Sequence, residues 1–150
     1  MPRTSNNRRP EKVGLFLLVL GWAALIPACQ QGPSFDFAEV EGAITKDGQP
    51  LDGVAVYFKP DGETRGPQSM GVTDEAGRYH LRTYKGDAGA AIGRHRICLL
   101  DVKEKYSSSA RSRIPSKYGN AAKTPLSDVE VKPSKQVLDF DVGTGRVSTP

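Results

Sequence analysis

Val54-Ala-Val-Tyr-Phe-Lys59 is the stretch that decides the fold class of this 150-residue chain. Beginning with Val54, every second residue is a bulky apolar one, which is the period expected of a strand with one buried face. The same alternation recurs from Glu39 onward, and no apolar stripe at the helical spacing is long enough to predict a helix there. We therefore expect an all-β domain.

Further alternating runs lie before and after this stretch. We expect strands at about 40–45, 54–59, 70–72, 79–83, 94–102, 129–131 and 138–142. Turn signals separate several of them, among them Asp47-Gly48 and Asp74–Gly77, where glycine takes a positive φ at little cost. Both faces of Ile97–Leu100 are apolar, so this strand is predicted to be central or covered. The fold prediction is a seven-stranded antiparallel β-sandwich.

The N-terminus has the pattern of an export signal. An apolar run from Val13 ends at Ala28 and follows four basic residues, Arg3, Arg8, Arg9 and Lys12. A positive head, an apolar body and a small residue before the cut predict a secretory signal peptide, here a signal helix over residues 1–28. Cys29 follows directly, so the segment resembles a bacterial lipoprotein signal whose cysteine is lipidated. An uncleaved signal anchor and a Cys29–Cys98 disulfide are the alternatives.

The charge of the exported part is close to neutral. Residues 1–28 contain four of the 21 basic and one of the 17 acidic residues, which leaves 17 against 16 and a net charge of +1. Such a chain has no global field that attracts a polyanion, so nucleic acid is not an expected partner. The 122 residues left after position 28 suffice for one domain.

Three segments are expected after the signal: a tether at 29–38, the sandwich at 39–142 and a disordered tail at 143–150. The tether contains Gly32 and Pro33, which favour neither helix nor sheet. A diacylated Cys29 would hold the protein on the periplasmic or extracellular face of a membrane, because two acyl chains give stable attachment. By resemblance to other bacterial lipoproteins, Gln30 in place of Asp favours the outer membrane.

Two sets of residues carry a resemblance to a known family. The first set contains Gly42, Asp47-Gly48, Pro50-Leu51 and Gly53, followed by Thr73-Asp74-x-x-Gly77-x-Tyr79. It resembles the carboxypeptidase regulatory-like domain, a transthyretin-like sandwich. The second set, Ile114-Pro115-x-Lys117-Tyr118 with Leu126, Val129-x-Val131 and Phe140, is similar to small bacterial lipoproteins built on that module. The resemblance implies an exported protein, and most members of the family have no assigned reaction.

The histidines and acidic loops do not form a catalytic or metal-binding pattern. His80 lies between two arginines on a predicted outward face, and no ligand at zinc spacing accompanies it. His95 replaces an aromatic residue of the family and is predicted to point inward, hydrogen-bonded or near the rim. The Asp61-Gly-Glu63 loop falls short of a calcium loop. We predict no catalytic residue, no metal and no cofactor.

The segment from Lys103 to Lys123 is the local basic patch. It contains six basic residues against Glu104, a net charge of +5. Arg111, Arg113 and Lys117 are therefore candidates for contact with anionic lipid or an acidic envelope polymer. A polar loop that covers a sheet edge is the alternative.

The sequence therefore predicts an exported, membrane-anchored and non-catalytic protein of the cell envelope. Its expected partners are the membrane, through Cys29, and an envelope protein, polymer, glycan or small ligand. A transthyretin-like hydrolase is one alternative, but the C-terminal Tyr-Arg-Gly-Ser signature of the hydroxyisourate hydrolases is missing. An adhesin-like structural module is another, but Asn120 lies in the long loop and not in the last strand, which disfavours an isopeptide bond.

Overall fold

The computed structural model describes Met1, residues 34–105 and residues 112–149. The predicted signal peptide, Cys29 and Arg111 lie outside the described residues. No helix among the described residues has the length and apolar character needed to cross a membrane.

One sheet has five strands and is antiparallel throughout. Its order is β10-β9-β4-β5-β7, with bounds Val129–Val131, Gly93–Asp101, Val54–Pro60, Ser69–Val72 and Arg82–Thr83. β9 pairs with β4 over seven residues from Val54↔Asp101 to Pro60↔His95. β9 is therefore an interior strand of this sheet, as the sequence predicts.

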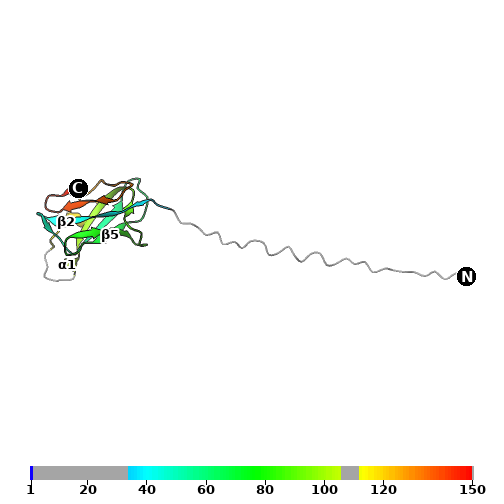
Figure 1. Cartoon of the computed structure of the whole chain (residues 1–150), viewed down its shortest axis with the longest axis horizontal. Helices are drawn as coiled ribbons and strands as arrows, with labels where there is room; N and C mark the ends of the chain where they lie inside the picture. The colour runs from blue at the N-terminus through cyan, green and yellow to red at the C-terminus, as the bar shows by residue number, and fades with distance from the viewer. Residues whose placement is uncertain (2–33, 106–111, 150) are drawn as a thin grey trace. The chain divides into compact units, whose positions relative to one another are not determined.

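The second sheet is built on β2, Val40–Lys46, which has partners along both of its edges (Figure 1). β6, Arg78–His80, and β3, Gln49–Pro50, pair with it in antiparallel fashion. β11, Gln136–Val137, and β12, Asp139–Asp141, run parallel to it, and β13, Arg146–Ser148, pairs with β12. A further small sheet joins β1, Phe37–Ala38, to β8, Ala90–Ala91.

Short helical turns lie between β9 and β10 in sequence. α1 spans Val102–Lys105, directly after β9. A 3-10 helix, η1, spans Ser116–Gly119 and contains the buried Tyr118. The chain between β9 and β10 therefore contributes both helical turns and the core residue Tyr118.

Three aromatic side chains join the two large sheets. Phe58 of β4 lies with its ring centroid 6.5 Å from that of Tyr79 on β6 and 6.2 Å from that of Phe140 on β12. Tyr79 and Phe140 stack at 6.3 Å. All three side chains are buried, and burial of large aromatic side chains contributes strongly to stability. The fold is therefore all-β and sandwich-like, with its core between the sheets.

Gly42 permits the closest approach in the second sheet. The Tyr79 hydroxyl donates a hydrogen bond of 2.6 Å to the carbonyl of Leu138, across the position of Gly42. A Cβ at Gly42 would lie 2.0 Å from that carbonyl oxygen. Only glycine therefore fits between these two backbone segments. Burial raises the pKa of Tyr79 well above its usual value, so its hydroxyl remains a donor.

The strand pattern differs from the prediction in two respects. Each predicted run coincides with one or more strands, but the described residues contain β1 to β13 and not seven strands. The sandwich is also not purely antiparallel, because β11 and β12 run parallel to β2. Alternation reports which face of a strand is buried and contains no information about the direction of its neighbour.

The run from Tyr79 to Thr83 is the clearest case of this difference. It was expected to be one strand, but β6 pairs with β2 of one sheet and β7 pairs with β5 of the other. Leu81 lies at the change and donates its N–H to the carbonyl of Val40. Gly71 of β5 allows the crossing, since a Cβ there would lie 2.5 Å from the carbonyl oxygen of His80.

The ordered domain also extends beyond its predicted limits. β1 falls within the expected tether at 29–38, and Ala38 is buried. β13 falls within the tail at 143–150 that was expected to be disordered, and it pairs with β12 over Arg146–Ser148. Both strands are short, and short edge strands have little periodicity to detect.

His95 points into the core, as predicted. The side chain is 1% exposed, and its ring lies 5.8 Å from the Phe58 ring. Nδ1 is 3.0 Å from the carbonyl oxygen of Gly93, so Nδ1 carries the proton and donates it. Nε2 is then an acceptor with no hydrogen-bond partner among the described residues. Burial lowers the pKa of His95, because protonation would place an unpartnered cationic N–H in the core.

This geometry predicts a loss of stability in mild acid. The unfolded state takes up the His95 proton at a higher pH than the folded state does, so stability falls as pH drops below about 6.5. His95→Phe should reduce this slope, measured by thermal unfolding between about pH 6.5 and 4.5. The carboxylates with lowered pKa, such as Asp101, lose their contribution only at lower pH. Equal slopes for the two proteins would contradict the assignment.

Candidate binding groove

The outer face of the five-stranded sheet carries two rows of apolar side chains, here called the outer rows. Strand register places Tyr57 between Met70 and Cys98, and Ala55 between Val72 and Leu100. These side chains lie opposite the buried Val54, Val56 and Phe58, because neighbouring residues of a strand point to opposite faces. Met70 is 41% exposed, Val72 51% and Leu100 47%. The face is therefore apolar and accessible at these three side chains, whereas Ala55 and Cys98 in the same rows are buried.

Residues 112–120, here called the wall segment, border these rows and convert them into a groove. The groove has a volume of about 940 Å³ and is lined by the outer rows except Cys98, together with Ile114, Pro115, Ser116 and Asn120. This volume lies within the range of about 300–1,000 Å³ typical of small-molecule sites. The lining exposes nearly equal polar and apolar surface, with hydroxyl and amide groups among the apolar side chains.

Arg113 fixes the start of the wall segment. Its Nε and Nη2 donate to the two carboxylate oxygens of Asp101, each at 2.8 Å, and its backbone N–H donates to Oδ2 of the same group. Nη1 donates to the Asp52 carboxylate at 3.1 Å, and Nη2 donates to the Asp52 carbonyl at 2.7 Å. The Asp101 side chain is only 2% exposed. We call this arrangement the Arg113 clamp.

The clamp also sets the charge state of its carboxylates. Hydrogen bonds from Arg113 hold the pKa of Asp101 below its usual value, against the opposing effect of burial. Hydrogen bonds from Lys103 and then Arg113 lower the pKa of Asp52. The pKa of Arg113 is raised in turn by its bonds to Asp101. Both carboxylates therefore remain ionised, and this end of the groove is internally neutralised.

Two more side chains anchor the segment that follows. The Tyr118 hydroxyl of η1 donates to the carbonyl of Val142 at 3.0 Å. The Thr124 hydroxyl donates to the carbonyl of Ile97 at 2.7 Å. Tyr118 belongs to the core cluster with Ile114 and Leu126. These contacts hold the wall segment against the domain at both ends.

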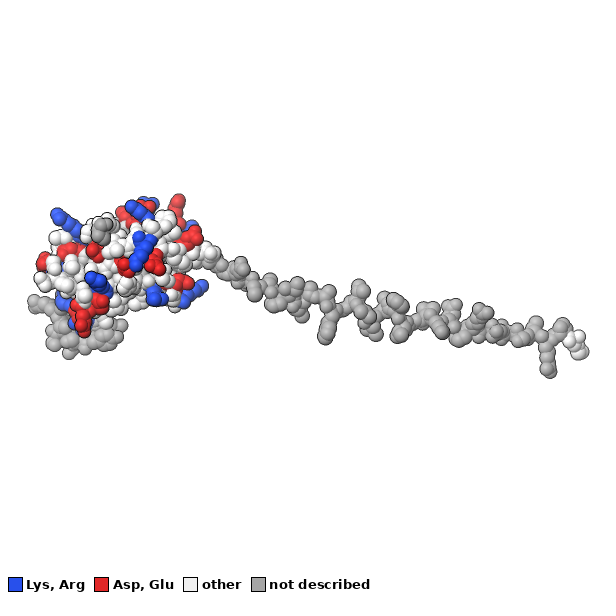
Figure 2. All heavy atoms as spheres, in the orientation of Figure 1, with Lys and Arg blue, Asp and Glu red and all other residues white. Residues whose placement is uncertain are grey.

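The predicted anionic-surface residues are not equivalent in the structure. Arg113 is committed to the clamp and does not present a free guanidinium. Lys117 is exposed, and its ammonium lies 5.4 Å from the Tyr118 ring centroid. Arg111 lies outside the described residues, as does the lipidation candidate Cys29. Figure 2 shows Lys and Arg interspersed with Asp and Glu on the face in view, without a patch of one sign.

The remaining polar candidates have structural contacts. His80 is exposed, and its Nδ1 lies 3.2 Å from Glu41 on the second sheet. Asp61 pairs with Arg96 at 2.8 Å, and Asp74 accepts the N–H groups of its own turn. Cys98 is a buried thiol whose pKa is raised by burial. Among the described residues, no group of three or more His, Cys, Asp or Glu side chains could hold a metal ion.

Sequence reasoning missed the groove, although one signal pointed to it. The two-sided apolar character of Ile97–Leu100 predicts a central or covered strand, and β9 is central, with Leu100 half exposed on its outer face. Met70 and Val72 were identified only as the start of a strand. Their side chains turn outward because Ser69 and Gly71 occupy the inward positions.

Comparisons with known proteins give no assignment, since no family model, curated protein or solved structure matches the chain. The residues that line the groove are therefore interpreted from their own geometry.

Removing the clamp should weaken the fold measurably. Arg113→Gln should lower the free energy of unfolding by about 2 kcal/mol, because the buried Asp101 carboxylate loses charged hydrogen bonds. Lys117→Gln, at the exposed cation four residues later, should change it by less than about 0.5 kcal/mol. Denaturant unfolding of both variants provides the test. Equal stability of the two variants would show that the clamp is not structural.

Proposed function

We propose that this chain is an exported, lipid-anchored protein of the cell envelope, and that it is a binding module without catalytic activity. In this proposal the groove over the outer rows takes an apolar chain or group. The observation that carries the proposal is the exposure of Met70, Val72 and Leu100 side by side beneath the wall segment. Exposed apolar side chains that cluster are typical of interaction sites, whereas singly scattered ones are not.

The anchor part of the proposal rests on the N-terminal sequence. Arg3, Arg8, Arg9 and Lys12 precede the apolar run that ends at Ala28-Cys29. Acylation of Cys29 in a bacterial envelope would keep the domain close to a membrane, and two acyl chains suffice for stable attachment. The placement on the periplasmic or extracellular face, with Gln30 favouring the outer membrane, belongs to the same proposal.

The groove lining supports binding more than bond cleavage. Tyr57, Ser112 and Ser116 supply the hydroxyl groups in the lining, and a serine nucleophile needs an adjacent general base. The two histidines of the chain lie elsewhere, with His80 on the second sheet and His95 inside the core. The sandwich-like fold and the glycine and aspartate turns support the resemblance to carboxypeptidase regulatory-like domains, which remains part of this proposal.

The anchor can be tested by changing one sulfur atom. Cys29→Ser should abolish incorporation of labelled fatty acid into the protein, because the thioether linkage requires the thiol. Cys98→Ser is the matched control, and it should leave acylation unchanged. Metabolic labelling followed by membrane fractionation measures both. Acylation that persists in the Cys29→Ser chain would refute the lipoprotein assignment.

The groove can be tested with a neutral apolar probe. Decanol should shift the methyl resonance of Met70, the only methionine besides Met1, in the full chain held in zwitterionic lipid discs. Leu100→Gln should weaken the apparent affinity about tenfold, because apolar contact area is lost. Val147→Gln, at a side chain of similar exposure (43%) on β13, should have no effect. If decanol leaves the Met70 methyl resonance unshifted, this groove is excluded as a site for apolar chains.

A further inference from the structure

A cation, Lys59, lies next to the groove on its Tyr57 side, outside the residues that line it. Lys59 lies two residues beyond Tyr57 on β4, so both side chains are on the outer face, and its cross-strand partner is Arg96. The Lys59 side chain is half-buried. Its ammonium is near enough to Cys98 to oppose the effect of burial on the pKa of that thiol. The ammonium therefore lies beside the outer rows.

The cation at this end lacks a carboxylate partner, whereas its neighbour has one. Arg96 donates from Nε to Asp61 at 2.8 Å and from Nη1 to the carbonyl of Ala121 at 3.2 Å. Over residues 34–105 and 112–149, no carboxylate lies within ion-pair distance of the Lys59 ammonium. Asp61 already offsets the charge of Arg96, so the Lys59 ammonium is the charge of this cross-strand pair that an external anion could neutralise.

A second cation borders the same rows. Arg82 of β7 is paired with Met70 and so continues the row formed by Cys98, Tyr57 and Met70. It is exposed, and its Nη1 donates to the carbonyl of Gly86 at 3.3 Å rather than to a carboxylate. Arg82 lines a second hollow together with Glu39 and Glu41, so Lys59 is the cation considered for the groove.

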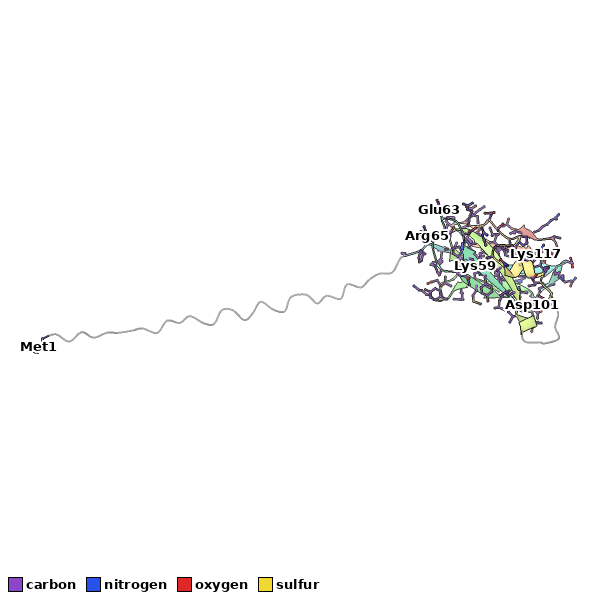
Figure 3. All side chains as sticks on the ribbon, turned by 180° about the vertical axis from the view of Figure 1, so that it is seen from behind. Met1, Lys59, Glu63, Arg65, Asp101 and Lys117 are labelled. Atoms are coloured by element: carbon purple, nitrogen blue, oxygen red, sulfur yellow. The ribbon has the colours of Figure 1, made fainter. Side chains whose placement is uncertain are left out.

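Among the described residues that line the groove, the one with a charged side chain lies at the opposite end. Asp101 lies there, at the end of β9 next to α1 (Figure 3), and its carboxylate is neutralised by the Arg113 clamp. From Ala55 to Lys59 the strand extends about 13 Å. Along this length the surface is apolar. Its charged group at one end is neutralised by the Arg113 clamp, and at the other end lies the unpaired ammonium of Lys59. This is the polarity that fits a single chain with an anionic head.

We infer that the groove binds a free monoacyl carboxylate of the fatty-acid class, with its chain along the outer rows and its carboxylate against Lys59. This inference rests on the proposed function, because it names the ligand class of the same groove. An uncharged chain would satisfy the apolar rows but leave the Lys59 ammonium without a partner. An acidic head satisfies both.

The test compares an acid with its matched alcohol. Decanoate and decanol are titrated into the full chain in zwitterionic lipid discs, and binding is followed through the Met70 methyl resonance. Lys59→Gln should weaken the apparent affinity for decanoate about fivefold, the value of one partly exposed charge pair, and should leave that for decanol unchanged. Because each probe is compared with itself, its partition into the disc cancels. Lys85→Gln, an exposed lysine in the 84–89 loop, serves as the control.

The other outcomes separate the two proposals. If both probes shift Met70 and Lys59→Gln affects neither, the groove stands and the assignment of a carboxylate is overturned. If neither probe shifts Met70, the proposed binding function fails together with this inference. If discs that contain anionic phospholipid shift Met70 without any added acid, the ligand is a membrane lipid and the free acid is excluded.

Discussion

The hydrogen bond from the Tyr79 hydroxyl to the Leu138 carbonyl is the contact on which the second sheet depends. It joins positions 59 residues apart in sequence, and it exists because Gly42 leaves room between them. The same tyrosine stacks on Phe140 and packs beside Phe58 of the opposite sheet. One side chain therefore links β2, the C-terminal strands and both layers of the sandwich. Its burial commits the face of β4 that carries Phe58 to the core and leaves the face that carries Tyr57 outside.

The Arg113 clamp determines what becomes of that outer face. An antiparallel sheet commonly has one solvated face, and here the wall segment lies along it. Ion pairs on a protein surface contribute little, but a guanidinium that satisfies a carboxylate as buried as that of Asp101 is a specific and directional contact. The residues that look like a basic patch in the sequence thus serve partly to position the groove. Less positive charge remains for an external anionic surface.

Much of the fold follows from local patterns, whereas the site does not. Alternation at Val54–Phe58 and Val40–Ile44 reports correctly which side chains face the core, and glycine with positive φ marks the turns at Gly48 and Gly77. The change of sheet at Leu81 could not be predicted, because it depends on the room that Gly71 leaves beside His80. The role of Arg113 was equally hidden, since its carboxylate partners lie 12 and 61 residues away. The sequence shows where charged residues occur along the chain, and only the folded structure shows which of them form ion pairs.

The apolar outer rows are not explained by folding alone. The inward-facing side chains of β4, β5 and β9 make the core, and polar residues at the outward positions would preserve the strand pattern equally well. Positions where a sequence departs from what its own fold requires are most often those with a function. Met70, Val72 and Leu100 are such positions, and the cations Lys59 and Arg82 lie beside these rows without an ion-pair partner among the described carboxylates. An accessible apolar strip favours an apolar chain, and an unpaired cation favours an anion. A surface that combines the two therefore recognises an amphiphile.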